Sequence, residues 1–301
     1  MPQCPHGGSR DPVFMTVLSA RELLAACERV LGPVTLVTDR SWQHGEHHVI
    51  EVSDSAGQRW IAKSVRERGS YEREIHALRN WAPALDGAAP ALRACDDAWQ
   101  LLIMTRLPGR LAEETEAELD PAVHKLAGQL IQQLHEAVPP ETDGDVAGAM
   151  AGKLELWIGR GSGLLTDAEI SFGREHVKPL TAVGPVSTVP CHLDNQPRNW
   201  LVDDDRRVSL IDFGMCRRDV WIRDMARLYV QQWAGRPDLR DAFYAGYGRI
   251  PAAADLVLLR CYLAYSAIST VVWAREHGDA LFEEQGRRTL ARLRAGDWYT
   301  S

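Results

Sequence analysis

The chain has 301 residues, of which 45% are hydrophobic and 25% are charged, an ordinary composition for a folded protein long enough to form two lobes. Lys and Arg number 34 against 41 Asp and Glu, which gives a net charge of −7. Nucleic-acid-binding proteins usually carry a basic excess, so we expect no nucleic-acid partner. No apolar run approaches the ~18 residues that a membrane span needs, so we also expect no membrane association.

The first fourteen residues are rich in Pro, Gly and polar side chains. They lack the apolar stretch of an export signal, so we interpret residues 1–14 as a flexible leader and expect a cytoplasmic protein. Ser19 and Glu22 then have the spacing of a capping box. Apolar residues at helical spacing follow as far as Gly32-Pro33, which predicts a short amphipathic helix.

The periodicity next changes from helical to extended. Turn residues separate short runs of β-branched and apolar residues, and one helical pattern interrupts them. We predict strands at 34–37, 48–52, 60–65, 91–95 and 100–105, and a helix at 71–81. Five strands and one intervening helix form a small α+β lobe, which we place at residues 15–106.

Beyond Leu107-Pro108-Gly109 the sequence becomes mainly helical. Asp120-Pro121 is a favourable N-cap and first-turn pair, and Thr166 with Glu169 fits a second capping position. The predicted helices cover 120–137, 148–158, a stretch after Thr166, 221–234, 238–248, 252–276 and 279–295. We therefore predict a helical C-terminal lobe over residues 107–301.

The most informative stretch places His192, Asp194 and Asn199 at the spacing H-x-D-x-x-x-x-N. An apolar strand follows and ends in Asp212-Phe213-Gly214. Phosphoryl transfer needs one carboxylate to orient a hydroxyl and accept its proton, and it needs a second carboxylate and an amide oxygen to hold Mg²⁺. We predict Asp194 as the catalytic base, with Asn199 and Asp212 as the magnesium ligands.

With these motifs the sequence resembles the kinase-like phosphotransferases, specifically the aminoglycoside phosphotransferase and choline kinase-like superfamily, over about residues 34–275. The resemblance implies a bilobal, protein-kinase-like α+β fold with a five-stranded antiparallel N-lobe, a mainly helical C-lobe, and ATP or GTP as phosphate donor. The catalytic loop of that family usually reads H-G-D, whereas this chain has Leu193 in place of the glycine. The replacement leaves the base and metal positions intact and affects the substrate side of the loop.

The resemblance assigns further positions in the first lobe. Lys63 matches the lysine that binds the α- and β-phosphates, and Glu74 matches the helix acid that pairs with it; Glu72 is a less favoured substitute. Around residues 39–48, the phosphate-covering loop has a single glycine, Gly45, whose backbone we expect near phosphate oxygens. The histidines of this loop have two alternative interpretations: they bind a metal ion, or they are simply exposed to solvent.

The segment that joins the lobes resembles the hinge of the family. There Met104 would flank the base, while the Thr105 carbonyl and the Leu107 amide would hydrogen-bond it. In the second lobe, Leu134-His135 and Asp224 match structural positions. Arg198 would contact the transferred phosphate or the substrate, or would instead pack on a neighbouring tryptophan as a surface arginine.

The type of kinase follows from what lies after Gly214. Asp224 lies only ten positions after Gly214, which leaves no room for the activation loop of a protein kinase. The same segment is rich in arginine, which favours a neutral or anionic acceptor over a polycation: Arg217, Arg218, Arg223 and Arg227. The acceptor is therefore expected to be a small hydroxylated molecule.

We predict an enzyme that transfers the γ-phosphate of ATP or GTP to a hydroxyl of an antibiotic or related natural product, such as an aminoglycoside, a nucleoside or another glycosylated antibiotic, and so confers resistance or self-protection. The alternatives are a metabolite kinase for homoserine, choline or a sugar, and a pseudokinase that binds a nucleotide without catalysis. Either a monomer or a homodimer is compatible with the sequence.

Overall fold

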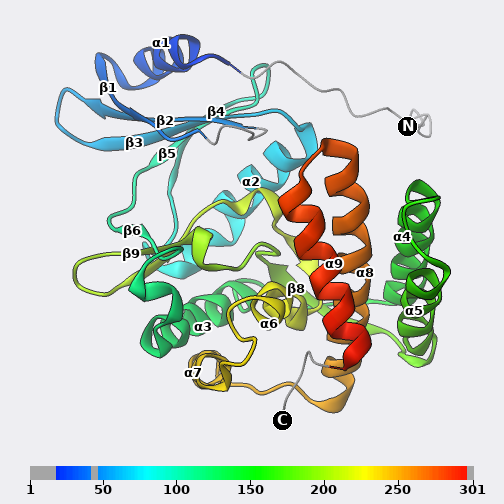
Figure 1. The fold of residues 1–301 in the computed structure, drawn as a ribbon. Helices are drawn as coiled ribbons and strands as arrows, with labels where there is room; N and C mark the ends of the chain where they lie inside the picture. Colours follow the sequence, from blue (N-terminus) through cyan, green and yellow to red (C-terminus); the bar gives the residue numbers. More distant parts are fainter. Residues whose placement is uncertain (1–17, 42–46, 297–301) are drawn as a thin grey trace, which may run out of the picture. The chain divides into compact units, whose positions relative to one another are not determined.

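The computed structural model describes residues 18–41 and 47–296, and the predicted leader and Gly45 lie outside the described residues (Figure 1). The chain divides into two compact units. The first comprises residues 1–108 together with 211–216, and the second comprises residues 109–210 and 217–301. The segment that contains Asp212 thus belongs with the first unit, although the second unit lies on both sides of it in the sequence.

The first unit is built on the predicted five-stranded antiparallel sheet, whose strand order is β1-β2-β3-β5-β4. The strands are β1 (Val34–Asp39), β2 (His47–Asp54), β3 (Arg59–Val65), β4 (Leu92–Asp96) and β5 (Leu101–Thr105). The two α-helices are α1 (Ala20–Leu31) and α2 (Arg68–Asn80), and a short 3₁₀ turn, η1 (Ala82–Leu85), follows α2.

The two helices of this unit cover opposite faces of the sheet (Figure 1). The predicted capping box of Ser19 and Glu22 is present at the start of α1. Leu23 and Cys27 of α1 pack on Ile50 and Ala62, which point to one face of the sheet. Since side chains alternate along a strand, Lys63 points to the other face, where α2 lies.

The second unit is mainly helical, as predicted. Its helices are α3 (Pro121–His135), α4 (Val146–Arg160), α5 (Asp167–Val177), α6 (Ala226–Val230), α7 (Pro237–Tyr247), α8 (Ala253–His277) and α9 (Ala280–Ala295). Its short strands form two three-stranded sheets: β6 (Arg110–Leu111), β9 (Trp200–Val202) and β10 (Val208–Leu210), and β7 (Glu141–Asp143), β8 (Val186–Cys191) and β11 (Arg217–Asp219). The predicted caps are present, because the side chains of Asp120 and Thr166 accept hydrogen bonds from the first turns of α3 and α5.

Two glycines allow α3 and α7 to pack closely. A Cβ atom at Gly246 would lie 1.9 Å from the Lys125 carbonyl oxygen, and one at Gly128 would lie 2.2 Å from the Phe243 carbonyl oxygen. Any larger residue at either position would force the helices apart. The contact matters for the site because α3 carries His135 and α7 carries Tyr247.

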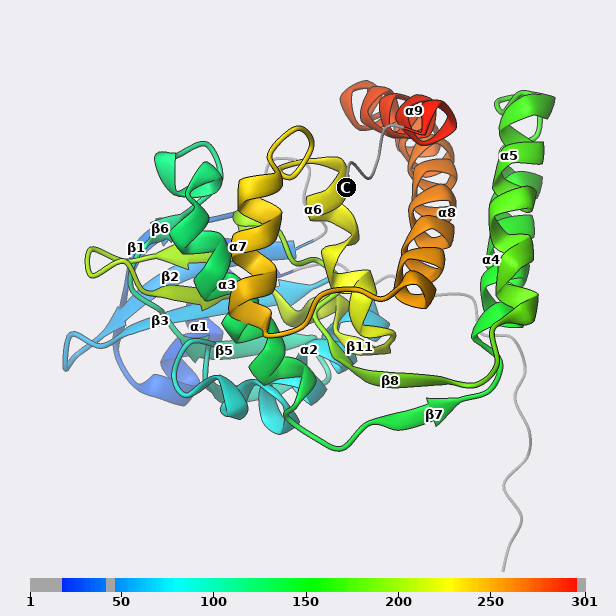
Figure 2. The same cartoon turned by 90° about the horizontal axis from the view of Figure 1, so that it is seen from below.

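Helix α8 corrects one expectation from the sequence. Over an 18-residue window it reaches a mean hydropathy of 1.6, so it is long and apolar enough to cross a membrane by composition alone. It packs against α4, α5 and α9, and 56% of that window is buried (Figure 2). This burial is typical of the core helix of a globular unit.

The prediction of one continuous helix at 221–234 is wrong. The structure has a 3₁₀ turn, η6 (Trp221–Met225), followed by the five-residue α6. Asp224 lies in this turn, and its carboxylate accepts hydrogen bonds from the backbone N–H groups of His192 and Leu193. The apolar spacing predicted an α-helix here. The chain departs from that helix where the Asp224 carboxylate forms tertiary hydrogen bonds.

Candidate active site

In the first unit, a single lysine joins two carboxylates. The Lys63 Nζ atom lies 2.8 Å from Glu74 Oε2 and 2.8 Å from Asp212 Oδ1. Burial opposes the charge on Lys63, but the carboxylates of Asp212 and Glu74 hold its pKa above the usual value. The other acid weighed for this role, Glu72, pairs with Arg68 instead. Three predicted site residues are thus brought together.

Helix α2 also anchors the segment that carries Asp212. The Gly214 carbonyl accepts hydrogen bonds from Ser70 Oγ and Arg73 Nε, at 3.2 and 2.8 Å. A Cβ atom at Gly214 would lie 2.6 Å from Ser70 Oγ, so the glycine is required by this close approach. Asp212 itself has a φ of 62°, and its side chain is 43% exposed. The segment is fixed to the helix while the carboxylate remains accessible.

Burial also shifts the pKa of Glu74, the second acid of this cluster, but in the direction that opposes its charge. Burial raises the pKa of Glu74, Lys63 opposes the rise, and the nearby charge of Asp212 adds to it. The backbone N–H of Phe213 also donates to the Glu74 carboxylate. Glu74 therefore depends on Lys63 for its charge, whereas Asp212 is open to solvent.

The predicted hinge residues lie at the end of β5. Met104 is buried and pairs with Ile61 of β3, and Thr105 pairs with Trp60. The Thr105 hydroxyl accepts a hydrogen bond from the Ala91 N–H at 2.9 Å. Leu107, two residues beyond the strand, is also buried. These contacts place the three residues in or just after an internal strand of the sheet, and their role in binding a base stays a prediction.

In the second unit, Asp194 lies in the loop between β8 and β9 and is surrounded by donors. Its Oδ1 atom accepts from Gln196 Nε2 at 2.6 Å, and its Oδ2 atom accepts from Asn199 Nδ2 at 2.7 Å and from Arg198 Nη2 at 2.9 Å. Arg227 Nε forms an ion pair with Oδ1 at 2.8 Å. The carboxylate is buried between two guanidinium groups and two amides.

A buried hydrogen-bonded chain holds this loop. Asp224 accepts from the loop N–H groups of His192 and Leu193, and its backbone carbonyl accepts from Asn195 Nδ2 at 3.1 Å. His135 Nε2 lies 2.9 Å from Asp224 Oδ2, and since a carboxylate only accepts, Nε2 carries the proton. Burial opposes ionisation of Asp224, but the hydrogen bond and charge of His135 and the loop N–H groups hold its pKa below the usual value.

The same hydrogen-bonded chain includes three described residues of the types that bind metal ions. Ligand-type atoms of His135, Cys191 and Asp224 lie within 4.8 Å of one another. The second ring nitrogen of His135 lies 2.8 Å from the Tyr247 hydroxyl, so both nitrogens already have protein partners. The cluster is therefore explained as a hydrogen-bonded support for the loop.

Leu193 occupies the position where the family usually has glycine, and its φ is 63°. This left-handed conformation suits glycine and is unfavourable for a leucine. The Leu193 side chain is buried and its N–H is bound by Asp224. Leucine is thus held in a backbone conformation that glycine adopts without strain.

Mg²⁺ prefers carboxylate and amide oxygens as ligands, and each unit offers one such group. Asp212 offers a partly exposed carboxylate in the first unit. In the second unit both hydrogen bonds of the Asn199 amide nitrogen go to Asp194, to its backbone oxygen and to its carboxylate. This orientation reserves the amide oxygen of Asn199 for another partner.

Three contributors to the site were not predicted as site residues from the sequence: Gln196, Arg227 and Tyr247. Gln196 lies inside the motif, and its position two residues after Asp194 was the available signal. Arg227 and Tyr247 lie 33 and 53 residues beyond Asp194, so only the folded chain reveals their contacts.

Fold and site together define a kinase-type phosphotransferase. A family model described as the phosphotransferase enzyme family matches residues 42–257, more than two thirds of the chain. The chain belongs to this family, so the predicted superfamily and the prediction of a phosphotransferase that acts on hydroxyl groups are confirmed. A comparison with curated proteins found no match.

Solved structures show the same fold at low sequence identity. A macrolide 2'-phosphotransferase from Brachybacterium faecium is 20% identical over 89% of this chain and 96% of its own, with a TM-score of 0.65. A choline/ethanolamine kinase family protein from Mesorhizobium loti is 19% identical over 92% of both chains, with a TM-score of 0.69. Aminoglycoside phosphotransferase APH(4)-Ia is 17% identical over 92% of this chain and 99% of its own, with a TM-score of 0.70. The predicted fold class is confirmed.

Proposed function

We propose that this protein transfers the γ-phosphate of ATP or GTP to a hydroxyl group of a small molecule. The observation that carries the proposal is the Lys63 ammonium, which lies 2.8 Å from both Glu74 and Asp212. A buried lysine held by a helix acid, next to an exposed aspartate, is the arrangement that kinase-like enzymes use to bind phosphates beside a metal. Lys63 would bind the α- and β-phosphates, with Glu74 positioning it.

Asp212 and Asn199 would hold Mg²⁺ through their oxygen atoms, and the ion would neutralise the charge of the phosphates. Met104, Thr105 and Leu107 would contact the nucleotide, and an enzyme that uses such a donor would act in the cytoplasm. An aminoglycoside phosphotransferase of the same fold, a thermostable mutant of APH(4)-Ia, forms a ternary complex with ADP and hygromycin B, which supports a nucleotide donor.

Asp194 would accept the proton of the attacking hydroxyl. The acceptor oxygen forms a bond to the γ-phosphorus, the bond to the bridging oxygen breaks, and the nucleoside diphosphate leaves. The hydrogen bonds from Gln196 and Asn199 hold the carboxylate in one orientation, and Arg198 would contact the transferred phosphoryl group. This division of roles relies on positioning and charge, as phosphoryl transfer requires.

For the acceptor we propose an antibiotic or related natural product, because several proteins of this fold act on antibiotics according to their names. A metabolite kinase is the second candidate, and the choline/ethanolamine kinase family protein of the same fold favours it. The four polar positions at Lys63, Asp194, Asn199 and Asp212 argue against a pseudokinase. A screen of hydroxylated antibiotics and metabolites with ATP and with GTP decides among these candidates.

Asp194→Ala tests the assignment of the base. Loss of a general base is expected to lower kcat by about 10²–10⁴-fold. Nucleotide affinity, measured by isothermal titration with Mg²⁺, should stay within about threefold of wild type, because the phosphates are assigned to Lys63 and Asp212. Arg288→Gln, an exposed substitution on α9, is the control. Full activity of Asp194→Ala would reject the assignment.

A further inference from the structure

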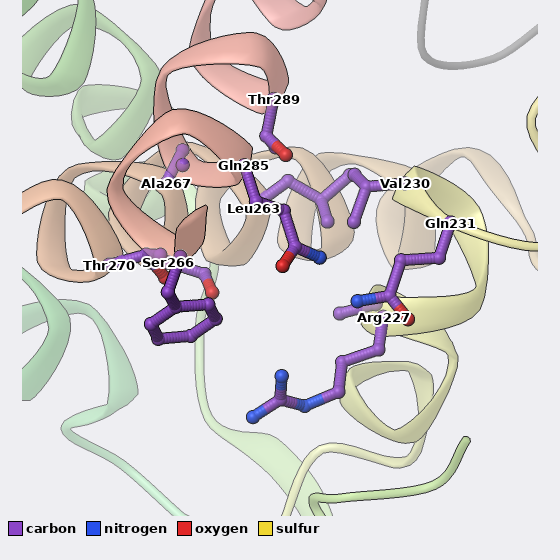
Figure 3. A pocket seen from close by; sticks show the side chains of 12 residues that line it. Arg227, Val230, Gln231, Leu263, Ser266, Ala267, Thr270, Gln285 and Thr289 are labelled. Carbon is purple, nitrogen blue, oxygen red and sulfur yellow. The ribbon is translucent and has the colours of Figure 1, made fainter. Parts of the chain in front are cut away.

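The second unit contains a pocket between α6, α8 and α9 (Figure 3). Leu263 and Phe282 supply apolar surface, while Ser266, Gln285 and Thr289 supply hydrogen-bonding groups. The mixed lining suits contact with a polar, hydroxylated molecule.

The charge on the residues that line this pocket is positive. Arg227 is the charged residue among the twelve that line it, and none of the twelve carries a carboxylate. The guanidinium of Arg227 reaches from α6 into the space that the other side chains surround (Figure 3). A cationic ligand would therefore meet repulsion here, and an anionic ligand would meet attraction.

Arg227 also retains hydrogen-bonding capacity. Its Nε atom forms an ion pair with Asp194 Oδ1 at 2.8 Å, and within the described part of the chain its guanidinium donates no hydrogen bond. The side chain is 35% exposed. A guanidinium presents a planar fork of N–H groups that matches the two oxygens of a carboxylate or phosphate.

Two guanidinium groups, those of Arg198 and Arg227, pair with the carboxylate of Asp194. Glu113 also interacts with the charge of Arg198. Burial raises the pKa of Glu113, while the Arg198 charge opposes the rise. Burial therefore weakens the negative charge that Glu113 contributes near these arginines.

We infer that Arg227 determines acceptor specificity by binding an anionic group of the acceptor. The acceptor is then a hydroxylated carboxylate or phosphate ester, with its acidic group on the Arg227 fork at the pocket between α6, α8 and α9. The inference rests on the proposed function, because it names the acceptor of that reaction. Arg227 links the pocket to Asp194, since one guanidinium contacts both.

The test uses two sets of compounds that share a skeleton and differ in charge: glucuronate, glucose 6-phosphate, glucose and glucosamine, and glycerate, glycerol 3-phosphate, glycerol and serinol. Binding to the full chain is measured by isothermal titration without nucleotide. We expect at least one acid to bind about tenfold or more tightly than its parent alcohol, and the amines to bind most weakly. Comparison of the carboxylate with the phosphate ester shows which oxyanion is preferred.

Three variants test whether Arg227 causes the preference for acids. Arg227→Gln should weaken binding of the acids by about ten- to a hundredfold and leave the parent alcohols unchanged, because one charge-assisted contact is lost. Arg227→Lys keeps the charge without the fork and should retain the order of preference with reduced affinity. Arg288→Gln removes a charge of the same sign on α9, outside the pocket lining, and should change nothing.

Several outcomes overturn the inference. They are failure of every acid to bind more tightly than its parent alcohol, preference for the amines, or an equal loss for all compounds in Arg227→Gln. Nucleotide-dependent phosphorylation of a neutral or amine compound that is insensitive to Arg227→Gln would leave the proposed function standing and the inference overturned. Tight, Arg227-dependent binding of acids with no phosphorylation of any compound would show that Arg227 binds anions, but it would overturn the role of Arg227 in acceptor specificity.

Discussion

The two units each contain a compact charged cluster, and the clusters are opposite in composition. In the first unit one cation, Lys63, lies between two carboxylates, those of Glu74 and Asp212. In the second unit one carboxylate, Asp194, lies between two cations, Arg198 and Arg227. The printed ion pairs therefore join one cation to two acids in the first cluster and one acid to two cations in the second.

The clusters also differ in burial. The side chains of Lys63 and Glu74 are almost fully buried, whereas those of Arg198 and Arg227 are 41% and 35% exposed. A charge that loses its partner in a buried cluster cannot be solvated, but one at a half-exposed position can. We therefore expect the first cluster to control stability as well as activity, and the cations of the second to control mainly activity and specificity.

The largest effect on stability is expected for Lys63→Met, which leaves Glu74 buried without its cation. The free energy of unfolding should fall by about 3–5 kcal/mol near pH 7, as found when one partner of a buried pair is removed. Without Lys63, burial and the charge of Asp212 both raise the pKa of Glu74. Urea denaturation followed by circular dichroism measures the loss.

The pH dependence and a double variant make this prediction specific. A raised pKa in the folded state means that the unfolded chain releases the Glu74 proton first, so stability should fall as pH rises above about 4, the ordinary value for Glu. The loss should be smallest at acidic pH. Lys63→Met/Glu74→Leu should regain most of the stability, and a loss independent of pH and of Glu74 would contradict the explanation.

His135→Leu should cost about 2–3 kcal/mol of unfolding free energy, because buried Asp224 loses a charge-assisted hydrogen bond. The catalytic loop is bound by the same carboxylate, so kcat should also fall while nucleotide affinity is retained. Tyr247→Phe, which removes only the hydroxyl at the end of the chain, is the milder control, with a loss of about 1 kcal/mol. Equal losses for both variants would argue that packing, and not the hydrogen-bonded chain, supports the loop.

Variants at Leu193 test the backbone strain in the loop between β8 and β9. Both Leu193→Ala and Leu193→Gly lose the buried side chain, but only glycine relieves the positive φ. Leu193→Gly should therefore be more stable than Leu193→Ala by about 1 kcal/mol. At exposed Ala291 in α9 the same exchange of alanine for glycine should have the opposite sign and a similar size. Thermal unfolding of the three variants and the wild type gives the comparison.

The smallest effect on stability is expected for Arg227→Gln, at less than about 1 kcal/mol, because the lost ion pair is partly exposed. This variant removes a cation from a carboxylate, as Lys63→Met does. A loss as large as that of Lys63→Met would remove the contrast between the two clusters. Parallel urea titrations of both variants measure the difference.

The sequence by itself determined the local elements and the catalytic motif. Ser19 with Glu22 and Asp120 with Pro121 mark helix starts through contacts within one turn, and alternation of apolar residues marks the strands, so these features were predictable. The spacing of Asp194 and Asn199 is likewise local. Where a helix was predicted wrongly, at 221–234, the deciding contacts came from a loop about thirty residues earlier in the sequence.

Only the tertiary structure decided which charges meet. Nothing in the spacing of Glu72 and Glu74 chooses between them, but Glu74 contacts Lys63 because it lies on the face of α2 that meets the sheet. The inclusion of residues 211–216 in the first unit and the pairing of Arg227 with Asp194 also join distant parts of the chain. Such contacts depend on side-chain direction and burial after folding, which a linear pattern does not contain.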